Sequence, residues 1–309
     1  MVWEDNNMLN QITTIIGEPV TQISTIQQGF TNRIYLLNSK YILRICTNKR
    51  NYNNFVRASK FCLRYHEAIN CPHILFTYYD NYNQYAWQLE EKRKGVNLSS
   101  AWMQLSKESR ENVVSKICFA IKQVHAIPIL DFFSENFVRT DWKEKFNKDI
   151  RKKIGNLEDL GYSEQIFEEI LLFVERNLES LDTTKYCICH SDLHFDNILV
   201  DENDNISILD YDRLRISSID YELDALFTMV NSPDLILHIE KKAIPPNAFE
   251  CAIPLVLKNY PELFDFPNLQ KRLSIYAIKH YLSFFEQYKE EVQEYLERIV
   301  KDKNYGKTY

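Results

Sequence analysis

Alternation of apolar and polar residues dominates the first ninety positions and predicts a small sheet. Alternation with period two is typical of half-buried strands, and short polar turns connect antiparallel neighbours. The predicted strands span residues 20–28, 33–38, 41–46, 74–79 and 85–89. Within this part, residues 55–69 carry apolar side chains three or four apart, which predicts one helix, and residues 9–16 predict a shorter helix that ends at Gly17.

Helical spacing replaces strand alternation after residue 95. Ser106 is placed to cap a helix with an apolar stripe from Val113 to Val124. Trp142, Phe146, Ile150 and Ile154 stand four apart on a second predicted helix that ends at Gly155. A third helix begins after Ser163, and residues 243–309 are helical and aromatic. The pattern predicts an α+β chain whose second part is mostly helical.

The stretch from His190 to Asp210, HSDLHFDNILVDENDNISILD, interrupts the helices with strand-like alternation. Apolar runs at 198–200 and 206–209 flank a polar turn and predict a β-hairpin. We expect Val200 to pair with Ser207.

That pairing would place the side chains of Asn197 and Asp210 opposite each other at the open end of the hairpin, with Asp192 nearby. Mg²⁺ prefers oxygen ligands and usually shares them with substrate phosphates. A carboxylate beside that metal can orient an attacking hydroxyl and accept its proton. These are the parts that phosphoryl transfer needs.

The spacing H-x-D-x-x-x-x-N followed by an apolar residue and D resembles the catalytic and metal loops of the protein-kinase-like superfamily. H-S-D-L-H instead of H-R-D, and L-D-Y-D instead of D-F-G, are similar to the aminoglycoside phosphotransferase and choline kinase family, whose members phosphorylate small molecules. The resemblance implies that Asp192 is the catalytic base and that Asn197 and Asp210 hold Mg²⁺. A hairpin that merely has polar ends is the alternative.

The resemblance also implies a bilobal, protein-kinase-like α+β fold. Residues 1–94 would form a small nucleotide-binding lobe with an antiparallel sheet and one helix. Residues 95–309 would form a larger, mostly α-helical lobe for catalysis and substrate binding.

Several residues of the first lobe are implied to bind the nucleotide. The loop with Gly29, Phe30 and Asn32 would cover its phosphates, although an ordinary hairpin turn is the alternative. Arg44 stands where the family usually carries a lysine for the α- and β-phosphates, and arginine can grip phosphate with two donors; a surface arginine on an edge strand is the alternative. Glu91 lies in the hinge, whose backbone would hydrogen-bond the purine.

The chain departs from the family after Arg44. The family usually places a glutamate in the first turn of the next helix to pair with this cation. Here that turn reads Asn51-Tyr-Asn-Asn-Phe55, and the first carboxylate, Glu67, lies too far along. The partner of Arg44 is therefore open, and a non-catalytic kinase-like binding protein is an alternative.

Other polar residues near these motifs favour structural roles. Asp196 is interpreted as a turn carboxylate rather than a contact for a cationic substrate. Asp220 and Asp224 are interpreted as helix caps, and His125 as structural. Asp212 is left open between helping to hold the metal and anchoring its loop.

Composition narrows the function classes. The chain has 309 residues, 45% of them hydrophobic. Its net charge of −6 gives no indication of nucleic-acid binding and weakly favours a cationic substrate. The start of the chain has no signal-peptide pattern and no apolar run reaches membrane-spanning length, so we expect a cytoplasmic protein. Seven cysteines without a C-x-x-C pattern indicate reduced thiols. Cys187 and Cys189 share one face of a predicted strand, where buried thiols are favoured over a metal role.

These observations predict a Mg²⁺-dependent kinase. It would transfer the γ-phosphoryl group of ATP or GTP to a hydroxyl of an aminoglycoside-like antibiotic or another small cationic acceptor. A choline- or ethanolamine-type metabolic kinase is the alternative within the same class. We expect a monomer or homodimer without nucleic-acid or membrane partners. The sequence decides neither the acceptor nor the choice between ATP and GTP.

Overall fold

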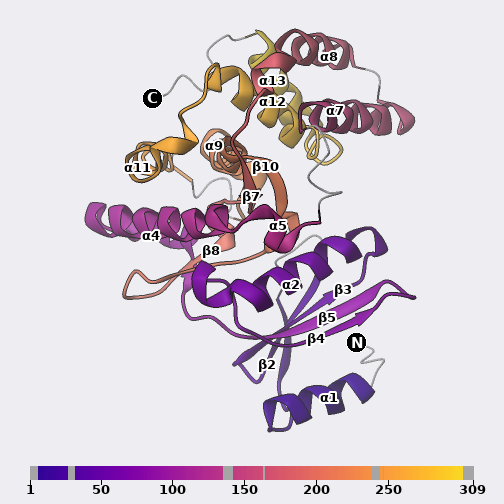
Figure 1. Ribbon diagram of the computed structural model, residues 1–309, viewed down its shortest axis with the longest axis vertical. Helices are drawn as coiled ribbons and strands as arrows, with labels where there is room; N and C mark the ends of the chain where they lie inside the picture. The colour runs from indigo at the N-terminus through magenta and orange to yellow at the C-terminus, as the bar shows by residue number, and fades with distance from the viewer. Residues whose placement is uncertain are drawn as a thin grey trace. The chain divides into compact units, whose positions relative to one another are not determined.

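The computed structural model describes residues 6–26, 32–134, 142–162, 164–238, 244–245 and 247–301 (Figure 1). The chain forms two compact units. The first comprises Met1–Val96 and Leu199–Leu214, and the second comprises Asn97–Ile198 and Arg215–Tyr309. The predicted α+β class is confirmed. The division into lobes at residue 94 stays a prediction.

The first unit contains a five-stranded antiparallel sheet in the order β1-β2-β3-β5-β4. Its strands are β1 (Ile23–Ile26), β2 (Asn32–Leu37), β3 (Tyr41–Cys46), β4 (Ile74–Asp80) and β5 (Tyr85–Glu91). Each overlaps a strand predicted from alternation. In the register of the two central strands, Arg44 on β3 lies opposite Gln88 on β5.

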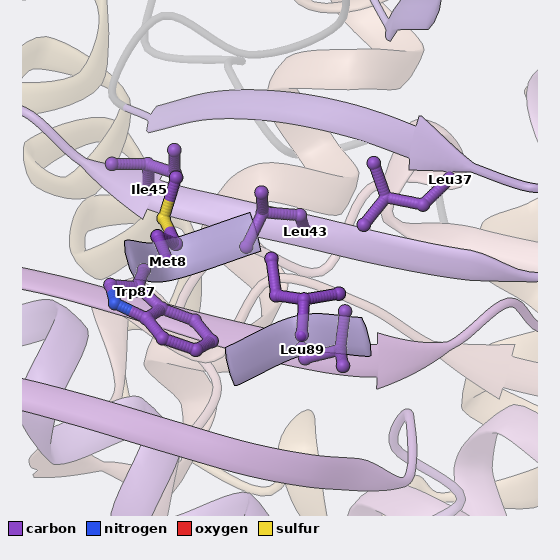
Figure 2. Close-up of a cluster of buried hydrophobic side chains, with 7 residues drawn as sticks. Met8, Leu37, Leu43, Ile45, Trp87 and Leu89 are labelled. Atoms are coloured by element: carbon purple, nitrogen blue, oxygen red, sulfur yellow. The ribbon is translucent and has the colours of Figure 1, made fainter. Parts of the chain in front are cut away.

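Two helices, α1 (Asn6–Ile16) and α2 (Tyr52–Ile69), pack against this sheet. The helix α1 buries Met8 and Ile12 in a core with the odd-numbered side chains of the central strands, and Figure 2 shows Met8 beside Ile45 and Trp87. The buried sheet residues of this core are Leu37, Leu43, Ile45, Trp87 and Leu89. The even-numbered residues Cys46 and Ala86 instead pack with Phe55 of α2. Because side chains alternate between the faces of a strand, Arg44 shares the α2 face.

A second sheet has the order β6-β8-β9, with β6 (Val96–Asn97), β8 (Ile198–Val200) and β9 (Ile206–Ile208). The backbone N–H of Asp201 donates to the carbonyl of Asn205 over 3.0 Å and closes the turn between β8 and β9. Antiparallel geometry then pairs Val200 with Ile206, and both side chains are buried. The predicted partner, Ser207, was wrong by one residue. Burial of one face sets the register, since a slip of one residue turns every side chain over.

The second unit is mostly helical, as predicted. Its helices are α3 (Leu98–Ala101), α4 (Lys107–Ala126), α5 (Ile129–Phe132), α7 (Trp142–Asp159), α8 (Gln165–Asn177), α9 (Leu223–Asn231), α10 (Pro233–Ile236), α11 (Ala252–Asn259), α12 (Leu269–Tyr281) and α13 (Lys289–Lys301). The strands β7 (Tyr186–Cys189) and β10 (Arg215–Ser218) pair antiparallel, and α4 packs on β7 and α11. In the described part of the chain, no helix is both long enough and apolar enough to cross a membrane.

The helix α7 runs past its predicted end at Gly155 to Asp159. Its end is set by Gly161, which has a φ of +91°. The N–H of Tyr162 donates to the carbonyl of Leu157 over 3.1 Å, and the N–H of Gly161 donates to that of Glu158 over 2.8 Å. These are the two bonds of a glycine-terminated helix end. A glycine with helical φ, such as Gly155, costs some stability but does not end a helix.

Asp220 and Asp224 have the structural roles that their sequence context indicates, although neither carboxylate caps a helix. Arg272 is fully buried, and its Nε and Nη2 donate to the two oxygens of Asp220 over 2.5 and 2.8 Å. The Oδ2 of Asp224 lies 3.1 Å from His280 Nδ1. Both contacts tie α12 to the start of α9.

Gly95 provides a stability prediction, because its φ is +113° and a Cβ there would lie 2.5 Å from the carbonyl oxygen of Val200. We expect Gly95→Ala to lower the free energy of unfolding by about 1–3 kcal/mol. The control is Gly155→Ala, in a helix with open space around it, which should raise stability by about 0.5–1 kcal/mol. Urea denaturation measures both. Equal stability of Gly95→Ala and the wild type would contradict the strained contact.

Candidate active site

The loop that follows β7 contains a strained residue. Ser191 has a φ of +66°, a left-handed conformation that residues other than glycine rarely adopt. The carboxylate of Glu222 holds this turn with both oxygens: Oε2 accepts the N–H of His190 over 2.9 Å, and Oε1 accepts the N–H of Ser191 over 3.0 Å. All three residues are buried. The clamp offsets the strain and fixes the direction in which the chain enters Asp192.

Glu222 is held in turn by His125, whose Nε2 lies 3.1 Å from Oε2. Burial opposes the charged form of Glu222, but the hydrogen bond and charge of His125 lower the pKa of the carboxyl. Burial likewise opposes the charged imidazole, but hydrogen bonds to Cys189 and Glu222 raise the pKa of His125 to about 9. His125 therefore has the supporting role expected for it. Its other nitrogen, Nδ1, lies 2.8 Å from Tyr260 Oη.

Asp192 and Asn197, two of the predicted site residues, are brought together by this loop. Asn197 Nδ2 donates to the backbone carbonyl of Asp192 over 2.9 Å and faces its Oδ2 at 3.4 Å. The same Nδ2 lies 3.1 Å from His194 Nε2. Since the amide nitrogen makes these contacts, the oxygen of Asn197 is the atom suited to ligate a cation.

Asp196 is anchored within the second unit, in agreement with its interpretation as a turn carboxylate. It is 8% exposed. Its Oδ1 accepts a hydrogen bond from Ser99, and its Oδ2 accepts the backbone N–H of His238 over 2.7 Å. These bonds occupy both carboxylate oxygens and fix the residue before Asn197.

Arg44, in the first unit, lies among three carboxylates. Its Nη2 donates to Asp210 Oδ1 over 3.1 Å and to Asp212 Oδ2 over 3.2 Å, and its Nη1 lies 3.8 Å from Glu90 Oε1. Burial disfavours the guanidinium charge, but the carboxylates outweigh burial and hold the pKa of Arg44 above its usual value. Arg44 is thus no surface arginine on an edge strand, because β3 is central and this side chain is 12% exposed.

Glu90 on β5 is a carboxylate partner of Arg44 that the sequence did not reveal. It follows Gln88, the residue opposite Arg44, by two positions on the same face of β5. Gln88 donates to Glu90 and accepts from Ser59, so a buried chain of polar groups holds the carboxylate. Burial raises the pKa of Glu90, and Arg44 opposes the shift. The carboxylate that the sequence lacks on the helix comes from the neighbouring strand.

Asp210, Asp212 and Asn32 form an oxygen-rich group beside Arg44. Asp210 has a φ of +56°, and its side chain is 38% exposed, whereas that of Asp212 is 13% exposed. Asn32 Nδ2 donates to Asp212 Oδ2 over 2.6 Å. Burial raises the pKa of Asp212, while Arg44 lowers it. The remaining oxygens, Asp212 Oδ1 and Asn32 Oδ1, are buried without a hydrogen-bond partner among the described residues.

The remaining nucleotide-binding predictions concern Gly29 and Phe30 in the phosphate loop and Glu91 in the hinge. Gly29 and Phe30 lie outside the described residues. The N–H of Glu91 donates to the carbonyl of His73 over 3.0 Å, and its exposed carboxylate faces the imidazole of the same residue at 3.2 Å. A purine contact at Glu91 would therefore have to use its carbonyl oxygen, and this role stays a prediction.

Sequence reasoning missed two residues, Glu90 and Glu222. Glu90 carries a usable signal, because it stands two positions beyond the residue opposite Arg44 once the strands are aligned. Glu222 lies between Asp220 and Asp224, the two aspartates that were interpreted as helix caps. The buried partners of Asp220 and Asp224, which are Arg272 and His280, lie about fifty residues away in the sequence and give no local pattern.

Comparisons with known proteins agree with this geometry. The model of the phosphotransferase enzyme family matches residues 22–235, about two thirds of the chain. No functionally curated protein sequence matches.

Solved structures of aminoglycoside phosphotransferases share the fold. One is APH(2")-IIIa with GDP and kanamycin, with a TM-score of 0.74 and 15% identity over 97% of this chain and 100% of that chain. Another is the ternary complex of APH(2")-IIa with streptomycin and ATP, with a TM-score of 0.68 and 16% identity over 96% and 97%. A third is APH(4)-Ia with ADP and hygromycin B, with a TM-score of 0.68 and 14% identity over 96% and 98%.

The family match covers the sheet of the first unit, the Arg44 cluster and the loop that contains Asp192. The chain therefore belongs to the phosphotransferase enzyme family: it has the kinase-like fold of the aminoglycoside phosphotransferases and is a phosphotransferase with an alcohol group as acceptor.

Proposed function

We propose that this protein is a Mg²⁺-dependent small-molecule kinase. It transfers the γ-phosphoryl group of ATP or GTP to a hydroxyl of an aminoglycoside-like antibiotic or another small cationic acceptor. The observation that carries the proposal is the loop clamped by Glu222, in which the Asp192 carboxylate is directed by a strained turn and contacted by Asn197.

Asp192 is the proposed catalytic base. A carboxylate at this position orients the acceptor hydroxyl and accepts its proton as the new P–O bond forms. Its side chain is 13% exposed, which limits competing water while leaving one face open. Phosphoryl transfer depends mainly on such positioning and on stabilisation of charge.

Asn197 and Asp210 are the proposed ligands of Mg²⁺, on the resemblance of their motif. Their chemistry fits, because Mg²⁺ prefers oxygen and both side chains offer it. The partnerless oxygens of Asp212 and Asn32 next to Asp210 also suit a cation or its water shell. When bound, Mg²⁺ would neutralise charge on the phosphates.

Arg44 is the proposed contact for the α- and β-phosphates. Its guanidinium is held on one side by Glu90 and is bonded to Asp210 and Asp212 on the other. Asn32, at the end of the predicted phosphate loop, reaches the same cluster through Asp212. This arrangement supports a role for the cluster in nucleotide binding, with Glu90 on β5 as a carboxylate partner of Arg44 in place of the missing helix glutamate.

The aminoglycoside-like acceptor is supported by the relatives of this fold, which hold kanamycin, streptomycin or hygromycin B. The net charge of −6 also suits a polycationic acceptor. By contrast, the exposed carboxylates of Glu290, Glu291 and Glu294 on α13, and of Glu286 in the turn before it, carry no argument.

An acceptor screen tests the proposal. ATP or GTP with Mg²⁺ is offered with aminoglycosides, macrolides, choline and ethanolamine, and phosphorylated product is detected by mass spectrometry. Product from an aminoglycoside supports the proposal. Product from choline or ethanolamine alone would replace it with a metabolic kinase, and product formation in excess EDTA would contradict the Mg²⁺ requirement.

The role of Asp192 predicts that Asp192→Asn lowers kcat by about 10²–10⁴-fold and leaves the KM for nucleotide nearly unchanged. Steady-state kinetics with the acceptor from the screen measure this. The control is Glu202→Gln, an exposed carboxylate on the turn between β8 and β9, which should keep wild-type turnover. Normal turnover by Asp192→Asn would remove the assignment of the base.

The role of Glu90 predicts that Glu90→Gln raises the KM for nucleotide about tenfold, since the substitution removes one of the negative charges that hold the buried Arg44 guanidinium, 3.8 Å away. Glu67→Gln on the exposed face of α2 is the matched control and should bind nucleotide normally. If Glu67→Gln weakens nucleotide binding and Glu90→Gln does not, Arg44 takes its partner from the helix.

A further inference from the structure

Three side chains other than the proposed base and the proposed Mg²⁺ ligands form a buried cluster in the second unit. They are His125 near the end of α4, and Cys187 and Cys189 on β7. One ligand atom from each lies within 4.8 Å of the others, and the two sulfur atoms are 3.4 Å apart. Within the described ranges of the chain, this is the one group of three or more histidine, cysteine or acidic side chains with such spacing.

The distances suit a small metal ion. Zinc binds sulfur at about 2.3 Å and imidazole nitrogen at about 2.0–2.1 Å, so tetrahedral ligands stand roughly 3.4–3.8 Å from one another. The two sulfur atoms, 3.4 Å apart, lie slightly closer together than two thiolates on one zinc ion, and the histidine nitrogen lies within 4.8 Å of both. Both cysteines lie on one face of a strand, and the pairing of β7 with β10 fixes their backbone. Small side-chain shifts therefore suffice to enclose an ion.

The surroundings of these three side chains also suit a bound metal ion. Cys187 and Cys189 are 6% and 0% exposed, and neither forms a disulfide. A divalent ion with two thiolates and a neutral imidazole has no net charge, so burial costs little. Metal binding releases the proton of the charged His125, and the ion then supplies the positive charge near Glu222. Histidine ligands usually give their second nitrogen to an oxygen partner. Here Nδ1 lies 2.8 Å from Tyr260 Oη and Nε2 lies 3.1 Å from Glu222 Oε2, so the nitrogen that binds metal gives up its present partner and the other nitrogen keeps its own.

Three protein ligands leave a fourth tetrahedral position, which water commonly fills.

We propose that His125, Cys187 and Cys189 form a binding site for one thiophilic divalent metal ion, with Zn²⁺ as the probe ion and water as the fourth ligand. Thiolate and imidazole ligands select such ions over Mg²⁺. The site is separate from the oxygen ligands proposed for Mg²⁺. It goes beyond the expectation that these two cysteines are simply buried thiols.

Metal titration of the whole chain tests the site. Reduced, metal-free protein is titrated with Co²⁺, and sulfur-to-cobalt charge-transfer absorption is followed, then its displacement by Zn²⁺. We expect one equivalent of Co²⁺ with thiolate bands and one equivalent of Zn²⁺ retained after dialysis. Oxygen ligands give no such bands, so Co²⁺ at the Mg²⁺ ligands cannot mimic the signal.

Two matched variants locate the site. Cys187→Ala should abolish the thiolate bands and weaken Zn²⁺ binding by more than about 100-fold, beyond the effect of losing an outer partner. Cys118→Ala, at a comparably buried thiol on α4, should keep both. Wild-type protein without thiolate bands overturns the proposal, whatever the folding of the variants. Wild-type affinity in folded Cys187→Ala overturns it too.

Discussion

The bidentate acceptance of two consecutive backbone N–H groups by Glu222 is the constraint on which the candidate site depends. Without it, the left-handed conformation of Ser191 would be held only by the long hydrogen bond from its Oγ to the carbonyl of Cys189, at 3.4 Å. Burial disfavours the charged form of the Glu222 carboxylate, but the hydrogen bond and positive charge of His125 offset this cost and lower its pKa. Three elements, β7, α4 and the turn before α9, thereby converge on the residue that precedes Asp192.

The first unit contains a similar buried ion cluster, in which the central charge is positive instead of negative. There a buried cation, Arg44, is stabilised by Asp210, Asp212 and Glu90. Removing one partner of such a buried group leaves the others uncompensated, so the residues act as one cluster. The cluster links a central strand of the sheet to the segment after β9, both within the first unit.

Much of this could be predicted from the sequence, where a local pattern carried the information. Strand alternation located the five-stranded sheet, and motif spacing located Asp192, Asn197 and Asp210, whose roles stay proposals. Gly155 was wrongly expected to end a helix, because the φ that makes Gly161 the end is not visible in composition.

The features that the sequence did not predict depend on contacts between residues far apart in the chain or on strand register. The Arg44 partner depends on the register of β3 and β5, and the Glu222 clamp joins residues about thirty positions apart. The hairpin register was missed by one residue because both pairings keep similar residue types together, and burial decides between them.

A double-mutant cycle between Glu222 and Asp192 tests most directly whether the clamped loop acts by placing the base. The four proteins are the wild type, Glu222→Gln, Asp192→Asn and the double variant, compared by kcat with the same acceptor and at temperatures where all are folded. Residues that act as a unit lose activity non-additively. The account predicts that Glu222→Gln lowers kcat in the wild-type background and adds nothing in the Asp192→Asn background. Equal losses from Glu222→Gln in both backgrounds would contradict it.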